Sequence, residues 1–450
     1  MRLLKCGFGV GFNLKRLTLT VVAVLCFHAA PVFLGALPLY NEPFNYWLDL
    51  PERWGTVDTE NLADVSFADP HRRAVLQVFA FAGDPGEPGG HAGDELDGDP
   101  DDPDGHHGSG KHDGAARPEH PEALADRFER SFQAAGERAS FAYQGRDAVL
   151  ADWSYIAGRI PARGYWLFWS SDETAFAVGA FAPEENYEQY HDTLLSALDS
   201  FAPGSQARLA PGPINQFYYP YPPPNRQIHE IPIGPREAEG EVNGRRDQTE
   251  RAEGPHTLPL PADEGEIEAS EVLIEREARV LHAWYAPDQP DGLWRDAWRR
   301  FYRAIYRDNY QRLAPLVPEL MRYFRRAGVS GDEVPHVLLA WLQEFAYRRV
   351  GGDADVQPPL SSLITGSGDC DSLGVVYAAL LHHLGYNAIL MVSHEYGHAM
   401  VGVDIDGAGA RFEYDGTAYL VAELTADVSM GQIDRSMADP AGWIGVELRP

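Results

Sequence analysis

Apolar residues along this chain recur in two patterned regions, separated by stretches that have no periodicity. In the first region, alternating or continuous apolar runs predict strands, and helical spacing predicts helices. The strands are predicted at 74–81, 140–143, 148–156, 165–170 and 174–181, and the helices at 122–135 and 184–201. Strands accompanied by two helices indicate a compact α+β domain over residues 40–202.

The second patterned region, 266–450, also combines helices with strands. Alternation predicts a strand over 271–285. Helices are predicted at 294–324 (with a break around Pro315 and Pro318), 337–349 and 372–384, and strands at 387–393, 398–405, 410–414 and 418–424. Asp415-Gly416 is a typical hairpin turn between the last two strands. A helix beginning near Cys370 should therefore pack on an antiparallel sheet beginning at His398, again in the α+β class.

Two stretches lack apolar periodicity. Residues 84–121 consist largely of Gly, Pro, Asp and His, so they cannot bury enough apolar surface to offset their ordering entropy, and we expect a disordered insertion. Residues 203–265 are expected to form a disordered, Pro-rich linker. The insertion and its border hold five histidines, but their spacing fits no standard cation loop, so no metal site is expected. They are His91, His106, His107, His112 and His120.

The N-terminus is typical of a secretory signal. Residues 1–16 carry Arg2, Lys5, Lys15 and Arg16 and no acid, and an apolar run follows to Phe27. We expect a signal peptide or an N-terminal anchor over 1–36, and the choice between them stays open because apolar character continues beyond it. The protein is therefore expected to be exported, and an uncleaved segment would tether it to a membrane.

The net charge of the chain argues against two classes of ligand. The 450 residues include 37 basic and 67 acidic side chains, for a formal net charge of −30. Loss of the basic segment 1–36 would make the balance still more negative. Nucleic acids and anionic lipid headgroups select for Lys and Arg, so neither is expected as a ligand.

Cys370 is the only cysteine outside the N-terminal segment, among three in the chain. It lies in the run 366–372 (Gly-Ser-Gly-Asp-Cys-Asp-Ser), at the start of a predicted helix. A lone cysteine in an exported protein pairs between chains, is an inert core thiol, or is reactive. A helix N-terminus lowers a thiol pKa, and flanking acids and glycines are unusual around a core cysteine. The surroundings favour a reactive thiol, with the inert thiol as the alternative.

A reactive thiol needs a base and a group that orients that base. His382 and His383 lie on the same predicted helix, about 18 Å along its axis from Cys370, which is too far. His394 lies in a polar turn, whereas His398 begins an apolar strand and is held rigidly. For the orienting carboxylate we favour Glu423, which lies among apolar neighbours in a predicted strand, over Asp415, which its turn already explains.

Together these motifs resemble the transglutaminase-like superfamily of papain-fold cysteine enzymes. The resemblance covers roughly 330–430 and rests on 366–371 (Gly-Ser-Gly-Asp-Cys-Asp), 397–403 (Gly-His-Ala-Met-Val-Gly-Val), 423–425 (Glu-Leu-Thr) and 342–347 (Leu-Gln-Glu-Phe-Ala-Tyr). It implies that Cys370 is the nucleophile, His398 the base and Glu423 the orienting acid, which is Asp in many relatives. It also implies that Gln343 and the Cys370 backbone N–H form the oxyanion hole.

The N-terminal region carries a second, faint resemblance. An apolar strand followed by Leu-Pro-x-x-Trp at 50–54 is similar to the start of domains of the PsbP and Mog1 group, over about 45–202. This resemblance brings no catalytic motif, and a binding or scaffolding role is expected for this domain.

Two functions follow as expectations. The first is an exported, cofactor-independent thiol enzyme with a protein or peptide substrate: an amide-bond hydrolase, protease or transglutaminase. The second is a non-catalytic module of the same fold that binds protein or cell wall.

Overall fold

The computed structural model describes residues 32–33, 38–83, 118–234, 256–284, 293–352 and 354–448. Most of the expected signal or anchor segment and of the expected insertion lies outside these ranges. No helix within them combines the length and apolar character that crossing a bilayer requires.

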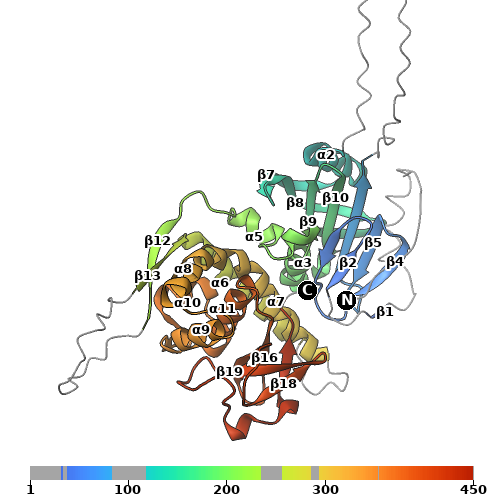
Figure 1. The fold of residues 1–450 in the computed structure, drawn as a ribbon. Helices are drawn as coiled ribbons and strands as arrows, with labels where there is room; N and C mark the ends of the chain where they lie inside the picture. The colour runs from blue at the N-terminus through green and yellow to red at the C-terminus, as the bar shows by residue number, and fades with distance from the viewer. Residues whose placement is uncertain are drawn as a thin grey trace, which may run out of the picture.

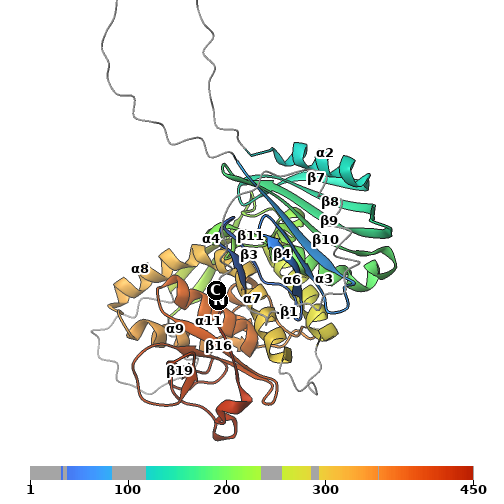
Figure 2. The same cartoon turned by 90° about the vertical axis from the view of Figure 1, so that its right-hand side faces the viewer.

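The fold is α+β, with mixed helices and mainly antiparallel sheets, as expected. The N-terminal body is an eight-stranded antiparallel sheet in the order β1-β4-β5-β6-β10-β9-β8-β7 (Figures 1 and 2). Its strands are β1 (Val32–Phe33), β4 (Gly55–Asn61), β5 (Asp64–Ala68), β6 (Val75–Ala82), β7 (Ala135–Tyr143), β8 (Arg146–Ala157), β9 (Ile160–Ser170) and β10 (Thr174–Pro183). β2 (Leu39–Asn41), β3 (Tyr46–Leu48) and β11 (Ala202–Pro203) form a separate small sheet.

Helices cover both faces of the large sheet, which explains its continuous apolar strands. α2 (Pro121–Phe132) packs on one face and α3 (Tyr187–Asp199) on the other. Along β9 the side chains alternate: Trp166 and Phe168 join the α2 side, and Leu167 and Trp169 join the α3 side. The aromatic residues of this strand are therefore core residues.

Much of the expected linker 203–265 is ordered, so that prediction is wrong for its described part. It contains α4 (Gly204–Ala207), α5 (Pro213–Tyr218) and the antiparallel strands β12 (Gln227–Ile233) and β13 (His256–Ala262). Residues 235–255 lie outside the described ranges. Ile231, Ile233, Leu258 and Leu260 are buried at alternate positions, while prolines occupy positions between them. Those prolines concealed a strand pattern in the sequence.

The C-terminal half surrounds a helix-on-sheet core (Figure 1). Its helices are α6 (Glu264–Trp284), α7 (Leu293–Leu313), α8 (Val317–Ala327), α9 (Glu333–Gln343), α10 (Pro359–Thr365) and α11 (Cys370–His383). Its main sheet, in the order β18-β19-β17-β16-β20, comprises β16 (Ala388–Ser393), β17 (His398–Val403), β18 (Arg411–Tyr414), β19 (Thr417–Ala422) and β20 (Ile444–Val446).

α11 packs directly on β16 and β17, and a glycine permits the close approach. A Cβ at Gly374 would lie 2.7 Å from Leu390 Cδ1, so any larger residue would force the Leu390 side chain to shift. The predicted hairpin turn is confirmed: Asp415 and Gly416 have φ of 46° and 78° between β18 and β19. The predicted contact of the Cys370 helix with the sheet that contains His398 is thus present.

The strand predicted over 271–285 is wrong, because residues 271–284 belong to helix α6. Within the span predicted as a strand, the buried face of this helix includes two charged residues, Arg276 and Glu277. Because these charges stand at core positions, the helical period of the apolar residues is interrupted in the sequence. The apolar residues that remain in this stretch alternate, and this alternation led to the prediction of a strand.

Those two charges join the N-terminal body to the C-terminal half. Arg276 Nη2 lies 2.7 Å from Asp199 Oδ2, and Glu277 Oε2 accepts hydrogen bonds from Ser196 Oγ and Arg300 Nη1, both at 2.7 Å. Burial opposes ionisation of Glu277, but Arg300 and Arg276 outweigh it and lower its pKa to about 2. The contact between the N-terminal body and the C-terminal half therefore contains a network of buried ion pairs.

α7 extends this contact through further arginines. Arg303 pairs with the Asp49 carboxylate at 2.8 Å. Arg307 donates to the backbone carbonyl oxygens of Asp199, Phe201 and Ala210 at 2.8, 3.0 and 3.0 Å. One helix therefore holds the end of α3 and the segment that follows it.

Candidate active site

Cys370 begins α11 at a capped and tightly held helix N-terminus. Asp369 is the N-cap, and its Oδ1 accepts hydrogen bonds from Ser372 N at 2.7 Å and Ser372 Oγ at 2.8 Å. The residues just before it form β15 (Ser367–Gly368), which pairs in parallel with β14 (Ala346–Tyr347). Burial raises the pKa of Asp369 to about 6. The backbone is therefore held on both sides of Cys370, by the β14–β15 pairing before it and by the capped first turn of α11 after it.

The thiol itself is buried, with 6% of Cys370 exposed. Its Sγ lies 3.5 Å from Asp371 Oδ2, to which it donates a hydrogen bond. Burial and the Asp371 carboxylate raise the thiol pKa, and the backbone N–H of Ala399 only partly opposes them. The low pKa expected from the helix N-terminus is therefore wrong for this arrangement.

Asp371 has a second partner that sequence reasoning missed. Tyr302 on α7 donates its hydroxyl to Asp371 Oδ1 at 2.5 Å. Burial raises the pKa of Asp371, while the charge of His398 acts in the opposite direction. Asp371 was visible as part of the cysteine motif, but Tyr302 is 69 residues away from it on another helix, and no spacing rule points to it.

His398 begins β17 and contacts Glu423. His398 Nε2 and Glu423 Oε2 are 2.6 Å apart. The register explains the contact: β17 and β19 are antiparallel with Val401 opposite Ala422, so the chain leaves β19 beside the start of β17. Glu423 follows β19 directly rather than lying within the strand. Asp415 is in the hairpin turn at the other end of β19.

Glu423 is held by a full set of donors. Besides His398, the backbone N–H and the hydroxyl of Thr425 donate to Glu423 Oε1 at 2.7 and 2.6 Å. Burial opposes its ionisation, but the hydrogen bond and charge of His398 outweigh burial and keep the pKa of Glu423 below its usual value. Glu423 is therefore an anion in a fixed orientation.

Gln343, at the end of α9, has a different set of contacts. Its Nε2 donates to the backbone oxygens of Glu423 at 2.8 Å and Val428 at 2.9 Å. Gln343 thus fastens the segment that carries Glu423. It is absent from the lining of the cavity that Cys370 and His398 share.

That shared cavity has a volume of about 190 Å³. Its walls come from α6, α7, the segment after β14, the start of α11 and the turn before β17. Among the lining residues are Trp298, Tyr302, Tyr347, Arg349, Asp355, Cys370, Asp371, His394 and His398. Cys370, His398 and the three aspartates Asp355, Asp369 and Asp371 therefore line one cavity with aromatic walls.

The other histidines of α11 lie elsewhere. His382 Nδ1 is 2.6 Å from the Tyr306 hydroxyl and its Nε2 is 2.9 Å from the Ala388 carbonyl oxygen. His383 Nε2 is 2.8 Å from the carbonyl oxygen of Tyr310. Both side chains serve packing near the helix C-terminus.

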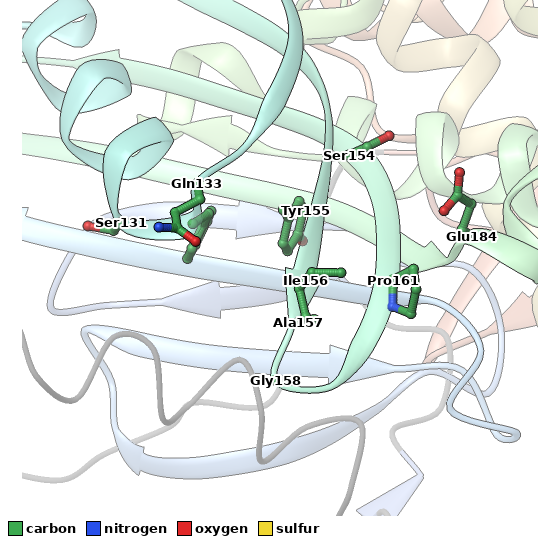
Figure 3. Close-up of a pocket in the computed structure, with 10 residues that line it drawn as sticks. Ser131, Gln133, Ser154, Tyr155, Ile156, Ala157, Gly158, Pro161 and Glu184 are labelled. Atoms are coloured by element: carbon green, nitrogen blue, oxygen red, sulfur yellow. The ribbon is translucent and has the colours of Figure 1, made fainter.

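A second cavity, of about 490 Å³, lies in the N-terminal body between the end of α2 and the β8–β9 hairpin (Figure 3). Of the polar side chains around it, Ser131, Ser154 and Glu184 point away from one another. Within the described ranges, no three His, Cys, Asp or Glu side chains are grouped to hold a metal ion.

No protein-family model matches the chain, and no curated protein sequence matches it. Solved structures similar to part of it include PsbP from Synechocystis sp. PCC 6803, with 13% identity over 39% of this chain and 96% of that chain and a TM-score of 0.26. LpqN of Mycobacterium tuberculosis, involved in cell envelope biogenesis, has 12% identity over 37% and 88%, with a TM-score of 0.22. A protein of Bacteroides thetaiotaomicron VPI-5482 has 8% identity over 59% and 75%, with a TM-score of 0.22. The PsbP match is consistent with the faint PsbP-like resemblance, and similarities at this level assign no function.

Proposed function

We propose that the chain is an exported, cysteine-dependent acyl-transfer enzyme acting on amide bonds of a protein or peptide. In this proposal Cys370 is the nucleophile, His398 the base and Glu423 the group that orients His398. The observation that carries it is the 2.6 Å contact between His398 Nε2 and Glu423 Oε2, together with the cavity that His398 and Cys370 both line. The basic and apolar segment 1–36 would direct the chain out of the cytoplasm.

The proposed chemistry follows from which imidazole nitrogen is occupied. Because His398 Nε2 donates a hydrogen bond to Glu423, Nδ1 is the ring nitrogen of His398 that is left to accept the thiol proton. The sulfur then attacks the carbonyl carbon, and the protonated imidazole returns the proton to the departing amine. Water, activated by the same nitrogen, would hydrolyse the resulting thioester.

The raised thiol pKa shapes the timing of this chemistry. A resting thiol that is protonated at neutral pH must lose its proton as the carbon–sulfur bond forms, so His398 acts as a general base during attack. The glutamate anion stabilises the imidazolium formed at that moment.

A second candidate is a non-catalytic module of the same fold. The burial of Cys370 and its raised pKa favour this candidate, since an inert thiol is typically buried in uncharged form.

Acylation by p-nitrophenyl acetate separates the two candidates. For an enzyme, the folded protein should release a burst of about one equivalent of p-nitrophenolate, and mass spectrometry should place the acetyl group on Cys370. The burst should vanish in Cys370→Ala and in His398→Ala. No acylation of Cys370 in the folded wild-type protein, at any pH from 6 to 9, would favour the non-catalytic module.

A further inference from the structure

Thiol attack on a carbonyl creates an oxyanion that needs hydrogen-bond donors. Two donors are the usual arrangement, and they must be aimed at the position where the charge develops. Cys370 supplies one, because the backbone N–H of a residue in the first turn has no acceptor within its own helix. The second donor must come from a side chain or backbone group in the same cavity.

Gln343, which the sequence indicated for this role, has no donor to spare. A glutamine amide has two N–H groups. Both lie on Nε2, which donates to the carbonyl oxygens of Glu423 and Val428. The two contacts hold the Glu423 segment and leave nothing to offer an oxyanion.

Other polar groups in the cavity are engaged too. The hydroxyl of Tyr302 donates to Asp371, and Arg349 pairs with the carboxylate of Asp355. Tyr302 uses its single hydroxyl proton for the carboxylate that faces the thiol, and Arg349 uses Nε and Nη2 for Asp355.

Tyr347 has both the right position and an available donor. Its backbone lies in β14, opposite Gly368 of β15, two residues before Cys370, and Arg348 N donates to Gly368 O at 2.9 Å. Its side chain is 58% exposed and lines the cavity with Cys370 and His398. Burial raises the pKa of the phenol above its usual value, so the hydroxyl keeps its proton and remains a donor at neutral pH.

We propose that the Tyr347 hydroxyl is the second oxyanion donor of the site, a catalytic residue of the acyl transfer proposed above. When Cys370 sulfur bonds to the carbonyl carbon, the carbonyl π electrons move to oxygen and the thiol proton moves to His398. Tyr347 donates a hydrogen bond to that oxygen. The electrons return as the leaving group departs with the proton from His398. This inference rests on the proposed function.

Two reagents separate oxyanion stabilisation from thiol reactivity. p-Nitrophenyl acetate acylates Cys370 through a tetrahedral oxyanion, whereas iodoacetamide alkylates the same sulfur by direct displacement without one. Tyr347→Phe removes only the hydroxyl. It should slow acylation by about 10- to 100-fold and leave the alkylation rate within about twofold. Tyr218→Phe is the matched control, since Tyr218 is 59% exposed and lies on α5, outside the cavity.

Each outcome decides the inference. If Tyr347→Phe is acylated at the wild-type rate, the inference is overturned. Slow acylation of a Trp298→Phe variant would then assign the role of second oxyanion donor to the Trp298 indole. An equal slowing of acylation and alkylation also overturns it, because Tyr347 would then act on the thiol. If wild-type Cys370 is alkylated but never acylated, the proposed enzyme itself fails, which is a distinguishable result.

Discussion

Asp371 places a carboxylate against the sulfur that we propose as the nucleophile. It accepts a hydrogen bond from the thiol on one oxygen and from Tyr302 on the other. A negative charge at this place stabilises the thiol over the thiolate. Asp371 therefore keeps Cys370 in its protonated form until a base removes the proton.

The pH dependence of alkylation tests this role of Asp371. Wild-type Cys370 should react slowly with iodoacetamide at neutral pH and faster as the pH rises, because its pKa is raised. Asp371→Asn removes the charge and keeps an acceptor for Tyr302, so the midpoint of the rate–pH curve should fall by about one unit. Asp415→Asn, in the distant hairpin turn, should leave the midpoint in place. A midpoint in Asp371→Asn equal to or above the wild-type value would contradict the prediction.

Glu423 is the residue on which orientation of His398 should depend. Glu423→Gln keeps the size but presents an amide to His398 Nε2, so the imidazolium loses its counter-charge. Acylation of Cys370 by p-nitrophenyl acetate should slow by at least about 100-fold while circular dichroism stays unchanged. Since Asp415 lies in the turn at the other end of β19 from Glu423, Asp415→Asn should acylate at the wild-type rate. Equal loss in both variants would show a general structural effect.

At the level of elements, the part of the chain from Cys370 to Ala422 could be predicted because local pattern and tertiary role agree there. The helix after Cys370, the strand from His398 and the Asp415-Gly416 turn each follow one clear period or turn signal. The elements that were predicted wrongly contain residue types that are unusual for the positions they occupy. In α6 buried charges interrupt the apolar period, and in β12 and β13 prolines occupy the positions between buried residues.

The site shows the same limit of sequence reasoning. Cys370, His398 and Glu423 are close in sequence to recognisable strand and helix ends, so their meeting could be anticipated. Tyr302 and Tyr347 reach the cavity only through the packing of α7 and of β14. A single sequence carries no signal for such packing, and Gln343 shows that a motif position can hold a different contact.

The N-cap of α11 gives a prediction at this scale. Asp369 has its pKa raised to about 6 by burial, compared with 3.8 in an unfolded chain. The folded state therefore binds the proton more tightly, so this group lowers stability as pH rises from about 4 to about 6. Asp369→Asn still offers an oxygen to Ser372 but cannot ionise. Its stability relative to wild type, from urea unfolding, should rise across that pH range.

A companion variant isolates the cap itself. Asp369→Ala removes the acceptor of Ser372 N and Ser372 Oγ, and should lower the free energy of unfolding by about 1–2 kcal/mol at pH 7. Equal stability of Asp369→Ala and Asp369→Asn would rule out the capping role.

For the whole molecule, the buried network around Glu277 joins the two halves. Glu277→Gln leaves Arg300 buried without its anionic partner and Arg276 with Asp199 alone, so we expect a loss of about 3–5 kcal/mol at pH 7. Because the folded pKa of Glu277 is about 2 and its unfolded value 4.5, its contribution is present above pH 4.5 and lost as pH falls toward 2. The difference between variant and wild type in urea unfolding should shrink over that range.

An exposed neighbour provides the control for this network. Glu275 lies two residues earlier on α6 and is exposed. Glu275→Gln should change the free energy of unfolding by less than about 0.5 kcal/mol. A comparable loss in both variants would mean that the effect of Glu277→Gln comes from the helix and not from the buried pairs.

The paired strands β12 and β13 have a practical consequence for building this protein from two genes. The chain could be divided after Gly244, between these strands, giving the polypeptides 38–244 and 245–450. Each polypeptide would contain one strand of the β12–β13 pair. Arg307 on α7 of the second polypeptide would donate hydrogen bonds to backbone carbonyl oxygens of the first. We expect the halves to copurify when expressed together and to restore Cys370 acylation. Fragment complementation of this kind would make the thiol chemistry dependent on a binding event.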